Sequence, residues 1–355
     1  MAAVIDTGIL SRHEDLAGVM VAGYDFVDGD TNPEDPGCPD ATTPSHGTHL
    51  SGTIAALTSN GRGVAGVNWG GAASTRIMPL RVFTNDAGSC AATTDRVVDA
   101  VYYAVSHSAR VVNMSFGIGY GNFSQALQDA INYAVAAGVV VVASAGNDNR
   151  DLDQLPRYPV CFANVIGVAA TTITNARPSY SNFGSCVDVV APGGDLSTDL
   201  NNDGNPDGVL STSGTQAAPS QYLFTHGTSF AASHVTGLAA LLMAKGVTGP
   251  STVQSVLQSS ATDLGPSGYD PSFGWGLISA GAALGAPAST NLMRAFTGIS
   301  SSSSITVASD MVAVSSSGTF SVDILPGEDA SHTGRGIRNL WLGDLPPPGL
   351  GLAAP

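Results

Sequence analysis

Short apolar runs alternate along the chain with longer segments in which apolar residues recur at helical spacing. Several of the short runs are apolar without a break, which is typical of strands buried on both faces of a sheet. The predicted strands span residues 2–8, 76–83, 110–117, 139–147, 165–170 and 187–194. Strands that alternate with helices indicate an α/β fold with a mainly parallel sheet flanked by helices.

Four longer segments have the pattern of helices, at residues 46–57, 93–108, 123–138 and 229–246. In the second of these, Asp95 lies near the N-terminus, where the helix dipole favours a carboxylate. Gly138 is expected to end the third helix. One face of the second helix is predicted to be apolar, with Val97, Val98, Val101, Ala104 and Val105 along it.

Polar residues follow three of the predicted strands. Asp6, Ser115 and Asn147 each stand at or just past the end of an apolar run. In open parallel sheets, binding and catalytic residues gather at the carboxyl ends of the strands. We therefore expect these three residues to lie at one edge of the sheet.

The character of the sequence changes after about residue 285. We expect residues 1–286 to form one domain, and residues 287–355 to form a Ser/Gly/Pro-rich linker and a short, partly disordered extension. Alternating residues at 305–314 and 319–324 suit a β-hairpin within it.

Composition narrows the class of protein. Hydrophobic residues make up 43% of the chain and charged residues 12%, so a substantial core can form. The net charge of −15 argues against a nucleic-acid binder, which would present a basic face. No apolar run approaches the ~20 residues of a membrane span, and no secretory signal is visible. We expect a monomer.

Four cysteines, at positions 38, 90, 161 and 186, allow three disulfide pairings. One alternative is four buried thiols. The even number in loop-like sequence favours two disulfides, and so an oxidising compartment. We favour Cys38–Cys90 and Cys161–Cys186, since each pair lies in Gly/Pro/Ser-rich sequence and closes the shorter loop.

Three polar residues suggest nucleophilic chemistry when they are taken together. Asp6 follows a strand, while His46 and Ser229 each stand at the start of a predicted helix. Alone, each has an ordinary explanation as a turn, loop or helix-capping residue. Together they supply a nucleophile, a base and a group that orients the base, in the order Asp, His, Ser.

The flanking sequences resemble those of a known family. "AVIDTGI", "HGTHLSG" and "GTSFAASHV" resemble the three catalytic blocks of the subtilisin-like serine proteases, or subtilases. The resemblance extends to "GVAGV", "IMPLRVF", "VVNMSFG" and "VVVASAGNDN" and covers roughly residues 2–285. It implies a subtilisin-like three-layer fold and a secreted serine endopeptidase acting on proteins or peptides.

The resemblance also implies roles for individual residues. Asp6 would orient His46, which would act as general base and then as general acid, and Ser229 would form an acyl-enzyme. Asn147 would stabilise the oxyanion together with the backbone N–H of Ser229. His49 is expected to be structural, and the role of His226 stays open.

Substrate is expected to pair as an extended strand with two segments. These contain Ser115, Phe116 and Gly117, and Ala143, Ser144, Ala145 and Gly146. The small residues of 143–146 suggest a roomy primary pocket, and so a preference for large apolar residues before the cleaved bond.

The loop "DLNNDGNPDG" has the spacing of a calcium site. Oxygen-bearing side chains alternate and Gly204 stands sixth, as in the first nine positions of an EF-hand-type loop. Leu210 replaces the glutamate of position 12. We expect a structural Ca²⁺ site, against the alternative of an Asx-rich turn, formed by Asp199, Asn201, Asp203, Asn205 and Asp207.

Two features depart from the family pattern. The sequence starts close to Asp6, so we expect a catalytic domain that lacks the usual N-terminal segment, signal and propeptide; an inactive scaffold or binding domain is the alternative function. Ser233 replaces the family's proline, and we expect its hydroxyl to bond to the carbonyl of Ser229.

Overall fold

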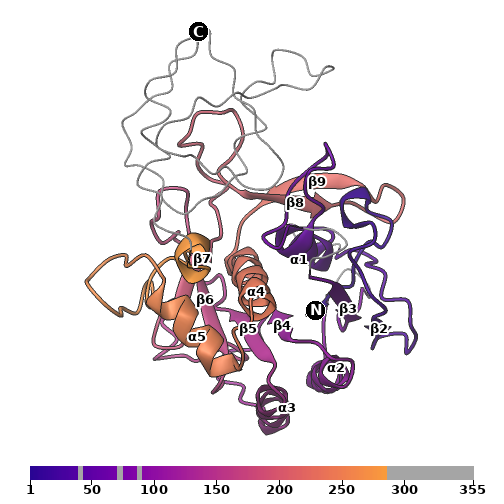
Figure 1. Cartoon of the computed structure of the whole chain (residues 1–355), viewed down its shortest axis with the longest axis horizontal. Coiled ribbons are helices and arrows are strands. Elements are labelled where there is room, and N and C mark those ends of the chain that lie inside the picture. The colour runs from indigo at the N-terminus through magenta and orange to yellow at the C-terminus, as the bar shows by residue number, and fades with distance from the viewer. Residues whose placement is uncertain (39–42, 70–74, 86–89, 286–355) are drawn as a thin grey trace.

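Seven parallel strands form the central sheet, in the order β2-β3-β1-β4-β5-β6-β7 (Figure 1). The computed structural model describes residues 1–38, 43–69, 75–85 and 90–285. The strands are β1 (Ala2–Asp6), β2 (Tyr24–Asp25), β3 (Ile77–Arg81), β4 (Val111–Met114), β5 (Val140–Ser144), β6 (Ile166–Thr171) and β7 (Val189–Pro192). This confirms the α/β fold with a mainly parallel sheet.

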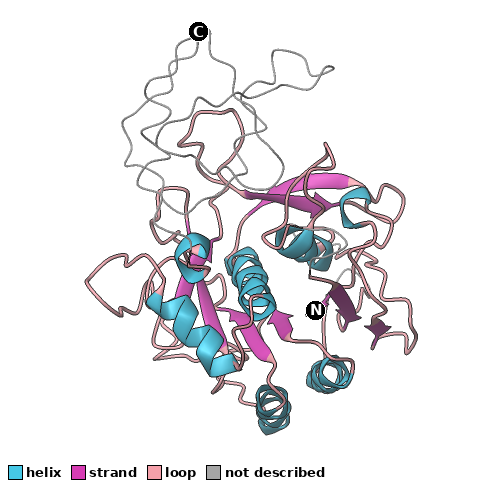
Figure 2. Cartoon of the chain, in the orientation of Figure 1, coloured by secondary structure: helices cyan, strands magenta, loops and turns pink. Residues whose placement is uncertain are grey.

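Helices cover both faces of the sheet and complete three layers (Figure 2). Along β1, Ala2 and Val4 pack into one apolar cluster, whereas Ala3 and Ile5 pack into the other. Successive side chains of a strand point to opposite faces, so both clusters are supplied by the same strands. One cluster includes residues of α1 (His46–Ala55), α4 (Thr228–Ala244) and α5 (Pro250–Ser259), and the other includes residues of α2 (Thr94–Ser106) and α3 (Gln125–Ala136).

The apolar face of α2 differs slightly from the expected one. Val97, Val101 and Ala104 are fully buried as predicted, and Ala100 joins them, while Val98 and Val105 are only half-buried. α2 and α3 pack side by side against the sheet, so the face between them is the better covered one. Gly138 follows α3 with a φ of 85°, as a glycine past a helix end should.

An antiparallel hairpin was not predicted from the sequence. It consists of β8 (Val209–Ser213) and β9 (Gln221–Thr225) and packs on α1 (Figure 1). A Cβ on Gly52 would lie 2.2 Å from Oγ1 of Thr212, so only glycine permits this close approach. The short α6 (Ala280–Ala283) and the 3₁₀ turn η1 (Glu14–Leu16) complete the described elements.

Two disulfides hold the loops around the sheet. They join Cys38 to Cys90 and Cys161 to Cys186, with Cα–Cα distances of 5.7 and 5.0 Å, which is the pairing favoured from loop length. The predicted C-terminal extension and its hairpin lie outside the described residues.

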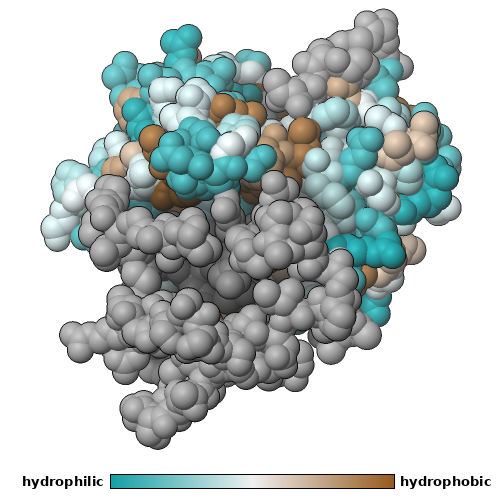
Figure 3. Space-filling view, turned by 90° about the horizontal axis from the view of Figure 1, so that it is seen from above, coloured by the Kyte–Doolittle hydropathy of each residue, from teal (hydrophilic) through white to brown (hydrophobic). Residues whose placement is uncertain are grey.

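The described surface is mostly hydrophilic where it is visible in Figure 3. The large apolar residues that are exposed, such as Trp69, Phe123 and Trp275, come from different parts of the chain. Among the described helices, none combines the length and the apolar character that crossing a bilayer would require.

Candidate active site

The sheet brings three of the predicted site residues to one edge. Asp6 ends β1, Ser115 directly follows β4, and Asn147 lies shortly after β5. These three strands are consecutive neighbours in the sheet and run in the same direction. Two helices on one face, α1 and α4, pack against each other and carry His46 and Ser229 to the same edge.

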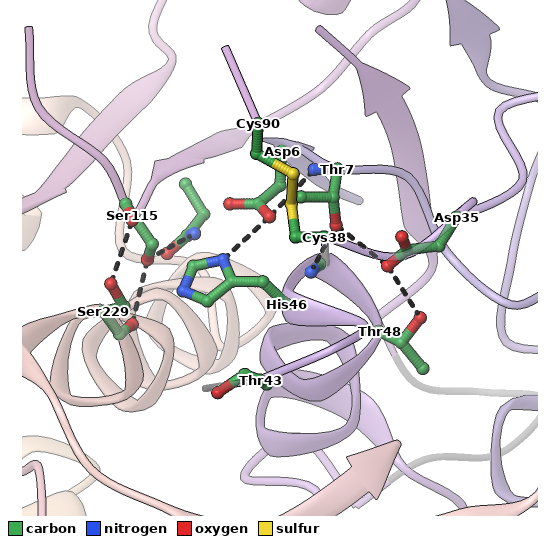
Figure 4. Close-up of polar contacts among 12 residues, drawn as sticks. Asp6, Thr7, Asp35, Cys38, Thr43, His46, Thr48, Cys90, Ser115 and Ser229 are labelled. Atoms are coloured by element: carbon green, nitrogen blue, oxygen red, sulfur yellow. Dashed lines mark hydrogen bonds and ion pairs between the residues drawn. A yellow bond between two sulfur atoms is a disulfide. The ribbon is translucent and has the colours of Figure 1, made fainter. Parts of the chain in front are cut away.

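Asp6 and His46 form a hydrogen-bonded ion pair. Nδ1 of His46 lies 2.8 Å from Oδ1 of Asp6, and the same oxygen accepts the N–H of Thr7 at 2.8 Å. Asp6 is buried, whereas the side chain of His46 is 21% exposed. The second ring nitrogen of His46 lies on the side that faces Ser229 (Figure 4).

The electrostatic setting of His46 favours its protonated form. Burial alone would lower the pKa of the imidazole, but the charge and hydrogen bond of Asp6 and the charge of Asp35 act against it. Together they raise the pKa of His46 above its ordinary value. A base of this kind can take a proton during a reaction and hold it briefly.

Ser229 is the second residue of α4, not its first. The helix begins at Thr228, and Gly227 is the N-cap with a φ of 147°. Ser229 therefore does not cap the helix with its hydroxyl. That hydroxyl donates to the carbonyl oxygen of Ser115 at 2.9 Å (Figure 4).

A buried chain of hydrogen bonds fixes the start of α4 to the end of β4. Thr236 donates to Oδ1 of Asn113 at 2.8 Å, and Nδ2 of Asn113 donates to Oγ of Ser115 at 2.9 Å. The hydroxyl of Ser115 then donates to the carbonyl oxygen of Ser229 at 2.9 Å. All four residues are buried, so the polar groups satisfy one another in place of water.

Asn147 is held by the residue before Ser229. Its Oδ1 accepts the N–H of Thr228 at 2.9 Å and the hydroxyl of Thr228 at 2.8 Å. Its Nδ2 lies on the side of Gly227, 3.2 Å from where a Cβ on that glycine would stand. The side-chain amide is thus oriented from its oxygen end, which leaves its N–H donors directed toward the N-terminus of α4.

A cavity of about 390 Å³ opens beside Ser229. Five of the seven residues predicted to bind substrate line it: Ser115, Phe116, Gly117, Ser144 and Gly146. Ala143 and Ala145 do not, because both are fully buried. The N–H of Ala145 donates to Val168 and its carbonyl accepts from Asn182, so its backbone is already paired.

An ion pair forms part of the cavity wall. Nη1 of Arg157 lies 2.6 Å from Oδ2 of Asp148, and the hydroxyl of Tyr120 also donates to that carboxylate. The guanidinium lies 5.0 Å from the centre of the Tyr120 ring. Asn182 donates to the Tyr120 hydroxyl at 3.1 Å, which ties the group to the loop between β6 and β7.

The remaining histidines of the motifs are structural. Burial lowers the pKa of His49 to about 3, and its Nε2 bonds to the carbonyl of Leu223 at 3.0 Å. Burial likewise lowers the pKa of His234 to about 4. Nδ1 of His226 accepts the N–H of Leu196 at 3.1 Å. None of the three is placed to serve Ser229 as a base.

Ser233 bonds to a different carbonyl from the one expected. Its hydroxyl donates to Phe230, three residues earlier, at 2.7 Å. The carbonyl of Ser229 is taken by the hydroxyl of Ser115, and the i−3 carbonyl is the alternative within reach of a helical serine.

The predicted calcium loop bends back on itself. The carboxylate of Asp199 accepts the N–H groups of Asp203 and Gly204, at 3.1 and 3.0 Å. Oδ2 of Asp207 accepts the N–H of Leu200 at 2.7 Å, while its Oδ1 is buried without a hydrogen-bond partner. Within the described part of the chain, no group of three or more His, Cys, Asp or Glu side chains is arranged to hold a metal ion.

Several residues at the site were not singled out from the sequence. Asn113 and Thr236 sit inside apolar segments, where a buried polar residue signals a required hydrogen bond. That signal could have identified them. Asp35 and Arg157 lie in loops without a regular pattern, and their place near the site depends on the folded structure.

A family model and several known proteins are similar to this chain. A model described as the subtilase family matches residues 1–276. The chain is 38% identical over 313 residues to an extracellular protease of Xanthomonas campestris pv. campestris, covering 80% of this chain and 51% of that protein. It is 36% identical to thermitase of Thermoactinomyces vulgaris, over 75% of this chain and 82% of that one.

Solved structures of similar proteins share the fold. A protease from Pseudoalteromonas arctica matches with a TM-score of 0.68 and 36% identity, covering 80% of this chain and 89% of that one. Fervidolysin from Fervidobacterium pennivorans matches with a TM-score of 0.66 and 32% identity, over 81% of this chain and 42% of that one. The chain spans about half the length of the Xanthomonas protease. With its family model, its relatives and its fold in agreement, this chain belongs to the subtilase family.

Proposed function

We propose that this protein is a serine endopeptidase that cleaves peptide bonds through an acyl-enzyme. The observation that carries the proposal is the hydrogen-bonded pair of Asp6 and His46 beside Ser229, at the N-terminus of a helix. In this proposal Ser229 is the nucleophile, His46 the general base and acid, and Asp6 the group that fixes the imidazole.

The reaction begins when the Ser229 hydroxyl turns from the carbonyl of Ser115 toward Nε2 of His46. His46 takes the proton as Oγ attacks the substrate carbonyl, and Asp6 stabilises the imidazolium. His46 then gives the proton to the leaving amine. Water, deprotonated by His46, attacks the acyl-enzyme and releases the acid with Ser229 restored.

The negative charge of the tetrahedral intermediate needs donors that are already in place. Nδ2 of Asn147 is one, because Thr228 holds the amide from its oxygen side. The N–H of Ser229 is the other, since the first N–H groups of a helix have no partner within it. The positive end of α4 favours the same oxygen.

Substrate would lie against the segments on either side of the cavity, as an added strand. Phe83 and Phe116 contribute apolar surface to the cavity, with their rings 5.4 Å apart. Arg157 is neutralised by Asp148, so the wall offers no unpaired charge. We therefore propose broad specificity with a preference for large apolar residues before the cleaved bond.

We further propose that residues 1–286 form the catalytic domain of a secreted protein. Named relatives include extracellular proteases, from Xanthomonas campestris pv. campestris and from Dichelobacter nodosus. Two disulfides are typical of proteins that work in an oxidising environment.

Calcium binding at residues 199–207 stays a proposal. The buried, unpartnered Oδ1 of Asp207 favours it, although no three His, Cys, Asp or Glu side chains of the described residues are arranged around a common metal position. If the loop binds Ca²⁺, removing calcium with a chelator will lower the melting temperature of the wild-type protein. The Asp199→Asn/Asp207→Asn variant will then melt at the same temperature with and without chelator. A wild-type melting temperature that chelation leaves unchanged would contradict the proposal.

Labelling with a serine-directed phosphonate tests the protease function. We expect a stoichiometric adduct on Ser229, located by mass spectrometry, and loss of the adduct in His46→Ala. Ser106→Ala, which changes an exposed serine of α2 outside the cavity, is the control and should still be labelled. A folded wild-type protein that forms no adduct would favour the alternative of an inactive scaffold.

A further inference from the structure

A second buried carboxylate lies behind the pair of Asp6 and His46. Asp35 is only 1% exposed and belongs to the loop between β2 and α1. Figure 4 shows it beyond Thr7, with its carboxylate directed to Thr7 and Thr48. A buried carboxylate is costly unless it is hydrogen-bonded, so a specific role for it is to be expected.

The hydrogen bonds of Asp35 reach the neighbours of both catalytic residues. Its Oδ2 accepts the hydroxyl of Thr7 at 2.8 Å, and Thr7 directly follows Asp6. Oγ1 of Thr7 in turn accepts the N–H of Gly47 at 3.0 Å, and Gly47 directly follows His46. One hydroxyl, oriented by Asp35, thus links the end of β1 to the start of α1.

Two further contacts hold the carboxylate itself. Its Oδ1 accepts the N–H of Gly37 at 2.9 Å, and the hydroxyl of Thr48 lies 3.5 Å from its Oδ2. Gly37 precedes Cys38, which is bonded to Cys90, so the loop is fixed covalently one residue away.

The charge of Asp35 interacts with the charges of Asp6 and His46. Burial raises the pKa of Asp35 to about 7, and the nearby charge of Asp6 adds to this, while the bonds from Gly37 and Thr7 and the charge of His46 oppose it. Asp6 faces it from β1 and His46 from α1. In its own loop, Glu34 accepts from Ser11 instead. Ionised Asp35 contributes to the raised pKa of His46.

We infer that Asp35 is a positioning residue of the active site, which orients Asp6 and His46 through Thr7 and Gly47 and places a second negative charge behind the imidazole. The inference rests on the proposed protease function. A carboxylate here stabilises the imidazolium that forms as Ser229 attacks, and it does so without touching the substrate.

The test is Asp35→Asn, which keeps the shape of the side chain and removes its charge. We expect the pH at which kcat/KM falls on the acid side to drop by about 0.5–1 unit, because the imidazolium loses a favourable charge. We expect kcat to fall about tenfold with KM unchanged. Glu34→Gln is the matched control, with the same change of charge in the adjacent residue, and should shift neither quantity.

An NMR titration of the His46 imidazole separates this inference from the proposed function. A lower His46 pKa in Asp35→Asn, but not in Glu34→Gln, supports the positioning role even if Ser229 forms no adduct. An unchanged His46 pKa in Asp35→Asn, or an equal shift in both variants, would overturn it.

Thermal unfolding shows whether Asp35→Asn is folded. The pKa of Asp35 is raised in the folded protein, so the folded state keeps this proton longer than the unfolded chain does. Its contribution to stability is therefore lost as pH rises from about 4 to about 7. Over that range we expect the melting temperature of Asp35→Asn to rise relative to wild type; a constant difference would contradict a buried charge at this position.

Discussion

At the scale of single residues, the site depends on how charges are paired. Asp148 and Arg157 neutralise each other in the cavity wall, and Asp6 is paired with His46. Removing one member of such a pair leaves the other charge without compensation, which changes what the site attracts. The cavity should therefore favour an acidic side chain when the carboxylate of Asp148 is removed, and a basic one when the guanidinium of Arg157 is removed.

Asp148→Asn and Arg157→Met form a matched pair of variants. Asp148→Asn leaves a positive charge at the cavity, so cleavage after Glu should increase relative to cleavage after Phe, by roughly tenfold for about 1.4 kcal/mol. Arg157→Met leaves a negative charge and should favour Lys instead. Cleavage profiling on a peptide library measures both, and identical profiles for the two variants would refute the role of this ion pair.

The pH dependence of activity follows from the raised pKa of His46. The base must be neutral to accept the Ser229 proton, so activity is present above its pKa and is lost as pH falls through it. We expect the acid side of the kcat/KM profile to lie above the ordinary histidine value of about 6.5. A midpoint below that value in the wild-type protein would contradict the electrostatic influence of Asp6 and Asp35.

At the scale of elements, α4 is positioned by the polar chain as well as by its apolar contacts. Thr236 lies two turns from Ser229 and connects to it through Asn113 and Ser115. Thr236 is buried and does not line the cavity beside Ser229. Its hydroxyl is nevertheless the hydrogen-bond donor to the buried Oδ1 of Asn113.

Thr236→Val should leave Oδ1 of Asn113 buried without its donor, at a cost of about 1–3 kcal/mol in the free energy of unfolding. Thr252→Val, at an exposed position of α5, is the control and should change stability by less than about 0.5 kcal/mol. Urea denaturation of both variants measures the difference. Equal changes in the free energy of unfolding in the two variants would show that the buried chain of hydrogen bonds does not add to the stability of the protein.

The sequence predicted elements better than the contacts between them. Long runs such as those of β5 and α4 are recognisable because each is apolar over its whole length. The hairpin of β8 and β9 was missed because Ser211, Thr212 and Ser213 are polar, although they are buried against α1. Asp6, His46, Ser229 and Asn147 could be proposed from sequence motifs, whereas Asp35 could be proposed only from its contacts in the fold.

At the scale of the whole molecule, the disulfides close loops of unequal length. Cys38 and Cys90 are 52 residues apart, and Cys161 and Cys186 are 25 apart. The longer loop has more conformational freedom to lose in the unfolded chain. Removing the Cys38–Cys90 disulfide, which closes the longer loop, should therefore destabilise the protein more than removing Cys161–Cys186.

We expect Cys38→Ser/Cys90→Ser to cost about 4 kcal/mol of unfolding free energy, and Cys161→Ser/Cys186→Ser about 3.5 kcal/mol. Only the first pair adjoins the loop of Asp35, so only its loss should also lower the pKa of His46. Chemical denaturation and an NMR titration of both double variants measure the two effects. A lowered pKa of His46 in Cys161→Ser/Cys186→Ser, with an unchanged pKa in Cys38→Ser/Cys90→Ser, would contradict this expectation.

Ser115 and Ser229 exchange two hydrogen bonds, hydroxyl to carbonyl in each direction. This reciprocal contact couples the segment proposed to bind the peptide to the proposed nucleophile. A change in the position of the Ser115 carbonyl therefore also changes the acceptor of the Ser229 hydroxyl. If the proposed function holds, substrate binding and the orientation of the nucleophile are linked through these two hydrogen bonds.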